Sequence, residues 1–331
     1  MQLAKMAESG TQRNQPIHEA AKRGDLATLK KLLKRGLFAK AVDIDEPGDD
    51  LRTPLHFAAA GSNVEAVKLI LEQKATLDKL DRREETALHL AAATGTLATV
   101  KLLVEHKAAL EKVGAEQNTA LLYALQRSEL DIAKFLIDSK AAVENAPDTE
   151  PTYLHACVGM GSIEAAKLLI ERKASLVTPV TVFLGYRLTP LHTACTLETP
   201  GMAAFLLDCG ADVNAQVDGS VTPLMVAAFY GRDAVVTLLL ERGADPAIKA
   251  RAEAPISGVL TALEVANIDA PQVIAVLKGW PNSIGFLLNS LGLHEYIVRF
   301  KAEAVTSPDL LLKLPEASLH DLIPKVSAER K

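Results

Sequence analysis

The residues of this chain best suited to chemistry are its eight histidines and three cysteines. Histidine serves as a general base or metal ligand, and cysteine serves as a nucleophile when its pKa is lowered. Neither residue type occurs here at zinc-ligand spacing, and no glycine-rich phosphate loop or Gly-x-Ser-x-Gly motif is present. Cys209 has no histidine near it in sequence. The sequence therefore predicts no catalytic residue, no metal site and no cofactor.

Five of the histidines recur at one position of an internal repeat. The run Thr53-Pro54-Leu55-His56 returns as Thr86 to His89, Thr119 to Leu122, Thr152 to His155, Thr189 to His192 and Thr222 to Met225. The fourth positions are 33, 33, 33, 37 and 33 residues apart. Degenerate copies at Gln15 to His18 and Thr261 to Glu264 bring the number of units to eight. Such a period indicates a stack of supersecondary units that share one core.

A 33-residue period that carries Thr-Pro-Leu-His resembles the ankyrin repeat. Ala58-Ala59, Ala227-Ala228 and the phrase Gly210 to Ala215 agree with that family in register. The resemblance implies an all-α fold, a solenoid of about eight helix-turn-helix units over residues 13–278, after a tail at 1–12. It also implies that the repeated histidine hydrogen-bonds backbone and links adjacent units. Stacked layers lie about 10 Å apart, too far for neighbouring histidines to share a metal.

Four units depart from the family where the second helix ends. Lys74, Lys107, Lys140 and Lys173 stand where Gly36, Gly210 and Gly243 stand in other units. Glycine suits that position because the helix ends there in a left-handed turn. The middle units therefore either end the helix differently or tolerate backbone strain, partly offset by the helix dipole.

Candidate protein-binding residues follow from the resemblance, since ankyrin proteins bind partners with turn tips and first-helix faces. They are Arg82, Arg83 and Glu85 at one tip, and Gln126, Arg127, Met160, Leu197, Phe229 and Tyr230 on first helices. Phe183 and Tyr186 belong to an apolar insertion, Val177 to Tyr186, which needs cover from its own solenoid or from a partner. Phe229 and Tyr230 are either binding anchors or packed against the next unit or the C-terminal region.

Residues 279–331 break the period and show a new apolar pattern. Leu291-Gly292-Leu293, Tyr296 and Phe300, followed by a leucine cluster and Asp321-Leu322-Ile323, resemble a sterile alpha motif (SAM) domain, a small helical bundle. The family's fifth helix has little sequence left after Pro324. The segment is thus an incomplete SAM-like domain, one with a short last helix, or a cap on the solenoid.

Composition narrows the function. The net charge of -5 gives no reason to expect nucleic acid, and no stretch approaches the roughly 18 apolar residues that span a bilayer. Three cysteines and a polar N-terminus favour a cytoplasmic protein, and the domain combination suggests association with the cytoskeleton or a cilium. We expect a non-enzymatic scaffold or adaptor for other proteins, with self-association through the SAM-like segment. The alternatives are a structural subunit of one permanent assembly and a chain that regulates an enzyme in trans.

Overall fold

The computed structural model describes residues 14–33, 43–94, 96–114, 118–143, 152–183, 186–252, 258–266 and 269–280. The side chains of residues 181–186 and 252–259 are outside this description. So are the predicted tail at 1–12 and, apart from Gly279 and Trp280, the predicted SAM-like segment at 279–331. Contacts divide the chain into a first unit, Met1–Thr149 with Lys167–Lys173, and a second unit, Glu150–Ala166 with Ala174–Lys331.

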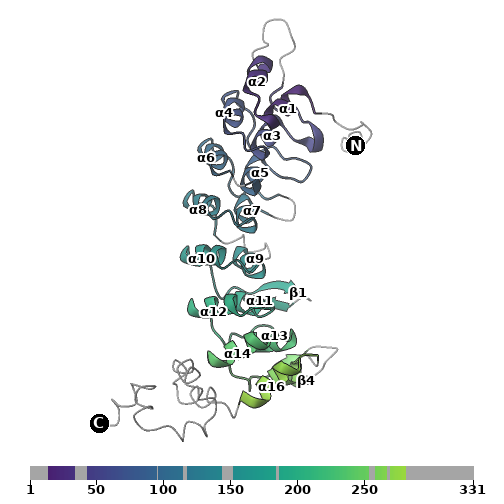
Figure 1. Cartoon of the computed structure of the whole chain (residues 1–331), viewed down its shortest axis with the longest axis vertical. Coiled ribbons are helices and arrows are strands. Elements are labelled where there is room, and N and C mark those ends of the chain that lie inside the picture. Colours follow the sequence, from purple (N-terminus) through teal and green to yellow (C-terminus); the bar gives the residue numbers. More distant parts are fainter. Residues whose placement is uncertain are drawn as a thin grey trace, which may run out of the picture. The chain divides into compact units, whose positions relative to one another are not determined.

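The first unit is built from helix pairs. Its helices are α1 (Pro16–Arg23), α2 (Leu26–Leu33), α3 (Pro54–Ala60), α4 (Val64–Glu72), α5 (Ala87–Thr94), α6 (Leu97–Glu105), α7 (Ala120–Gln126) and α8 (Leu130–Asp138), with a 3-10 turn, η2 (Asp49–Leu51). The first helices α1, α3, α5 and α7 stack in one row, and the second helices α2, α4, α6 and α8 stack in another (Figure 1). Apolar side chains between the rows form the core, among them Leu55, Ile70, Leu88 and Leu103.

The second unit repeats the pattern and adds strands. Its helices are α9 (Tyr153–Gly159), α10 (Ile163–Glu171, which crosses the boundary between the units), α11 (Pro190–Ala194), α12 (Gly201–Asp208), α13 (Pro223–Phe229), α14 (Asp233–Glu241), α15 (Ala262–Val265) and α16 (Pro271–Gly279). Strands β1 (Val180–Phe183) and β2 (Tyr186–Leu188) form one antiparallel hairpin, and β3 (Ala250–Ala252) and β4 (Gly258–Leu260) form another. First helices α9, α11, α13 and α15 again contact one another in order.

Each first helix begins where the repeat motif predicts. Thr53 is the N-cap of α3, where it forms a capping box with His56, and Pro54 occupies the first helical position. The Thr222 hydroxyl accepts from the backbone N–H of Met225 at the start of α13. These contacts supply acceptors for N–H groups that have no partner within the helix. Proline has no backbone N–H, so at the first helical position it leaves no donor without a partner. The local sequence therefore sets the helix start in each repeat.

The insertion predicted as an apolar loop is a β-hairpin in its described part. Val180 pairs with Leu188 across the two strands, and both side chains are buried. Val177, just before β1, is 72% exposed. The solenoid thus covers only part of the insertion. No helix among the described residues combines the length and apolar character needed to cross a membrane.

The four lysines at the second-helix ends adopt the left-handed conformation. The φ angles of Lys74, Lys107, Lys140 and Lys173 are 61°, 73°, 74° and 73°. Gly210 and Gly243 have φ angles of 92° and 91° at the equivalent turns. The lysine repeats therefore keep the glycine-type turn and accept its strain, which decides between the two alternatives left by the sequence.

Relief of this strain should be measurable at a single turn. Lys107→Gly is expected to leave the free energy of unfolding unchanged or to raise it by up to about 1 kcal/mol, because glycine adopts this φ without a Cβ penalty. Urea unfolding followed by circular dichroism would measure the change. A clear loss of stability would show that the lysine side chain makes a stabilising contact that outweighs its backbone strain.

Candidate functional site

The repeated histidines join one repeat to the next. The Nε2–H of His56 donates to the backbone carbonyl of Glu85, 29 residues further along, at 3.0 Å. On the other side of the ring, Nδ1 accepts from the backbone N–H of Thr53 at 3.1 Å. The same Nε2 contact to a later carbonyl recurs at His18 with Glu46, His89 with Lys112, His155 with Leu188 and His192 with Val221, at 2.8 to 3.1 Å. The predicted role of these histidines is confirmed.

This geometry requires a neutral imidazole. Because Nδ1 accepts a backbone N–H at His56 and His89, the ring proton must sit on Nε2, where it is donated to the carbonyl. Burial lowers the pKa of His56 and His89, although their carbonyl bonds oppose this effect. Burial lowers the pKa of His192 to about 4. The rings of His56, His89 and His192 are therefore neutral structural links at physiological pH.

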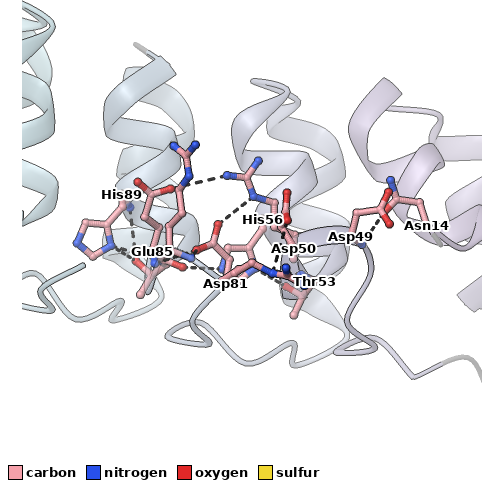
Figure 2. A network of polar contacts seen from close by, with 12 residues as sticks. Asn14, Asp49, Asp50, Thr53, His56, Asp81, Glu85 and His89 are labelled. Carbon is pink, nitrogen blue, oxygen red and sulfur yellow. Dashed lines mark hydrogen bonds and ion pairs between the residues drawn. The ribbon is translucent and has the colours of Figure 1, made fainter. Parts of the chain in front are cut away.

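A second polar cluster ties three repeats of the first unit together around Glu85. Figure 2 labels its two carboxylates, Asp81 and Glu85. Arg52, in the preceding repeat, donates from Nε to the buried Asp81 at 2.9 Å and lies 3.7 Å from the Glu85 carboxylate. Tyr123, in the following repeat, donates its hydroxyl to Glu85 at 2.5 Å. Asp81 also accepts from the backbone N–H groups of Arg83 and Glu85. Two buried carboxylates thus share one guanidinium and several donors, and we call this set the Glu85 cluster.

Removal of the tyrosine hydroxyl tests the cluster. Tyr123→Phe is expected to lower the free energy of unfolding by about 1–3 kcal/mol, because a buried carboxylate oxygen loses a charge-assisted hydrogen bond. Tyr230→Phe makes the same chemical change at a partly exposed ring and should alter stability by less than about 0.5 kcal/mol. Urea denaturation of both variants gives the comparison. Equal effects would mean that the Glu85 contact contributes nothing specific.

The predicted tip in the first unit is only partly a surface. Arg82 and Arg83 are exposed, and Arg82 lies 3.7 Å from Asp50 in an exposed ion pair. Glu85 is only 6% exposed and is held by its cluster, so its predicted placement at an exposed tip was wrong. Gln126 and Arg127 are exposed at the end of α7, as predicted. The arginines remain available to a partner, whereas Glu85 holds repeats together.

The second unit presents an apolar row on its first helices. Met160, Leu197 and Tyr230 hold equivalent repeat positions after α9, α11 and α13, and Phe229 precedes Tyr230. Met160 is 45% exposed and Phe229 is 56% exposed, while Leu197 and Tyr230 are half-buried. The ring centroids of Phe229 and Tyr230 are 5.4 Å apart, and the two rings pack edge to face. We call these four residues the apolar face. Phe183 and Tyr186 pair in the β1–β2 hairpin, but their side chains lie outside the described part.

The two buried cysteines have the surroundings of core side chains. Cys157 and Cys195 are buried, and burial raises the pKa of Cys157 to about 12 and raises that of Cys195 as well. Both thiols therefore stay protonated at neutral pH and act as small core side chains. Within the described ranges, no three histidine, cysteine or acidic side chains gather closely enough to hold a metal ion.

Stacked helix pairs joined by buried histidines define a helical repeat protein, and comparisons identify the family. The family model described as ankyrin repeats (3 copies) matches residues 17–113, 107–180 and 176–250. The chain belongs to the ankyrin-repeat family. The solved ankyrin repeat domain of Bcl-3, described as a unique member of the IkappaB protein family, is 30% identical, with a TM-score of 0.57 over 70% of this chain and all of that one. The human ASB11 ankyrin repeat domain is 24% identical, with a TM-score of 0.58 over 71% of this chain and all of that one, a likeness of fold.

Proposed function

We propose that the protein is a non-enzymatic, cytoplasmic scaffold or adaptor whose eight ankyrin repeats bind a partner protein at the apolar face. Ankyrin repeat domains generally mediate protein–protein interactions. The observation that carries the proposal is the exposure of Phe229, 56%, beside Tyr230 in a chain with only 4% aromatic residues. Exposed aromatic side chains are typical anchors of protein interfaces, because they bury a large area at low cost in side-chain entropy.

Helix α15 is the first helix that follows the aromatic pair along the stack. Helices α9 and α13 are seven residues long, whereas α15 ends at Val265 after four residues. In repeat register, Phe229 and Tyr230 correspond to positions beyond that end. The last described turn of α15 therefore stops short of the aromatic pair. A partner side chain or helix that packs on the exposed ring of Phe229 would bury it.

The remaining parts of the proposal concern segments and properties beyond the described fold. Residues 279–331 would form the SAM-like domain and provide self-association as a second mode of attachment. Arg82, Arg83, Gln126 and Arg127 would add polar contacts in the first unit. Association with the cytoskeleton or a cilium would follow from the bound partner. The alternatives of a permanent structural subunit and of an enzyme regulator differ in stoichiometry, since a permanent subunit copurifies in a fixed ratio.

Substitution of Phe229 tests the apolar face. Phe229→Ala is expected to weaken partner binding tenfold or more, because truncation of an aromatic anchor removes its buried contacts. Its effect on stability should be less than about 1 kcal/mol, since more than half of the ring is exposed. Partners crosslinked to the native full-length protein would be identified by mass spectrometry, purified and titrated by calorimetry against both forms.

A matched control separates this face from general surface stickiness. Val113→Ala removes an exposed apolar side chain in the first unit, outside the apolar face and the insertion, and should leave binding unchanged. If Phe229→Ala binds the purified partner as tightly as the wild type, the partner uses another surface. If both variants weaken binding alike, the interface is not the one proposed.

A further inference from the structure

A row of lysines follows the second helices of the first unit. Lys74, Lys107, Lys140 and Lys173 are all exposed, and all four belong to that unit. They are 33 residues apart, so they occupy one position in successive repeats. The equivalent positions in the second unit are Gly210 and Gly243, which carry no charge. The basic row is therefore a property of one part of the array.

At the equivalent turns of the second unit, packing does not require a particular side chain. All four residues adopt a left-handed φ that glycine tolerates better. At Gly210 and Gly243, a Cβ atom would meet no atom within 4 Å, so neither bulk nor its absence is demanded by neighbours. Residues held in a strained backbone conformation often mark functional surfaces. The property that lysine adds here, against its backbone preference, is an ammonium group on a long exposed stem.

Within the described residues, the ammonium groups of the row form no ion pairs. None of the four lysines lies within 4.0 Å of a carboxylate there. Several nearby acids are engaged elsewhere. Asp45, Asp78 and Glu111 accept from the backbone N–H groups of Thr76, Ala109 and Ala142, each two residues after a lysine of the row. Asp138 binds Arg172 at 2.6 Å.

Three other acids are the last residues of helices α4, α6 and α10, which precede lysines of the row. Glu72, Glu105 and Glu171 are exposed, each two residues before a lysine. Their negative charges offset part of the positive charge of the row. A partner selected here must therefore match the positions of the lysines, because the surface is not uniformly basic. Spacing, more than total charge, should decide which segment binds.

We propose that this lysine row binds an extended acidic segment of another protein that carries a carboxylate at every third residue. Neighbouring packed helices lie about 8–10 Å apart, which sets the step between successive lysines. An extended chain rises about 3.3 Å per residue, so three residues advance by about 10 Å. Carboxylates at every third residue thus meet successive ammonium groups. This surface is separate from the apolar face and does not depend on it.

The test uses the full-length protein and two labelled synthetic peptides of identical composition. One peptide repeats Glu-Ser-Gly four times, and the other places its four glutamates together. Fluorescence anisotropy at low salt is expected to show at least fivefold tighter binding of the spaced peptide. Binding should weaken steeply when the salt concentration rises, because exposed charges are screened. Equal affinity for the two peptides would overturn the proposal.

Variants separate the row from the other charges of the surface. The fourfold change Lys74→Gly, Lys107→Gly, Lys140→Gly and Lys173→Gly is expected to weaken binding of the spaced peptide at least tenfold while the urea midpoint stays equal or rises. The matched control changes Lys68, Lys101, Lys134 and Lys167 to glutamine, which removes the same charge from the exposed helix faces, and should cost less than threefold. If the control costs as much as the row, or the row variant binds normally, the row is not the site.

Discussion

Gly219→Ala is expected to lower the free energy of unfolding by about 2–4 kcal/mol. Gly219 has a φ of 76° in the turn between Val217 and Val221, where alanine is strained. A Cβ atom there would also lie 2.9 Å from the backbone carbonyl oxygen of Arg251. The backbone N–H of Arg251 donates to the carbonyl of Gly219 at 2.7 Å, so this contact holds the turn against β3.

Gly243→Ala is the matched control. Gly243 has a φ of 91°, but its added Cβ would meet nothing within 4 Å. It should therefore cost only the backbone preference, about 1 kcal/mol. Urea unfolding by circular dichroism gives the two losses, and hydrogen exchange at residues 217–221 and 250–252 locates them. Equal losses for the two variants would mean that the approach of Arg251 is not tight.

Much of the repeat architecture was predictable because it is encoded locally. The Thr-Pro-Leu-His run specifies an N-cap, a first helical proline and a histidine link, and each of these can be found in one short stretch of sequence. The left-handed turn at Lys107 was one of two alternatives that the sequence left open, and it was suggested by the glycines that hold that turn elsewhere in the chain. Because these local signals recur with a fixed period, the repeat can be recognised even where single copies depart from the motif.

The Glu85 cluster was missed because it depends on three repeats at once. Taken by itself, Glu85 is a polar residue in a turn, which favours exposure. One available signal was the spacing: Arg52 and Glu85 are 33 residues apart, at equivalent positions of adjacent repeats, and carry opposite charges. Such a pair stacks, and Tyr123 closes over it from the next repeat. Vertical comparison of equivalent positions finds contacts that a search along the chain overlooks.

The β1–β2 hairpin is a second feature that was not predicted from the sequence. The insertion was predicted as an apolar loop, although Val180, Thr181 and Val182 are β-branched and Gly185 follows them. β-branched residues favour strands, and glycine favours a tight turn. The high content of apolar residues indicated only that the insertion must be covered by the solenoid or by a partner. The hairpin meets part of that need by burying Val180 and Leu188, and it leaves Val177 exposed.

The buried histidines should make the protein sensitive to mild acid. Burial lowers the pKa of His192 to about 4 in the folded chain, below the value of 6.5 for a free imidazole. Between these values the unfolded chain binds the proton and the folded chain does not, so stability rises with pH. The contribution is complete above about pH 6.5 and is lost as the pH falls toward 4. For His192 alone, we expect a loss of roughly 2 kcal/mol between pH 7 and pH 5, and His56 and His89 act in the same direction.

Urea unfolding at a series of pH values, with a histidine-free variant of the link, tests this expectation. His192→Gln can still donate an amide N–H toward Val221 but cannot be protonated, so its unfolding free energy should fall less between pH 7 and pH 5. The variant should start less stable at pH 7, because the amide replaces only part of the buried ring's packing. His106→Gln changes an exposed histidine at the end of α6 and should keep the wild-type slope. Parallel curves for the wild type and His192→Gln would show that the link does not sense pH. If only the His192→Gln curve is shallower, the neutral imidazole that joins adjacent repeats also makes the free energy of unfolding depend on pH.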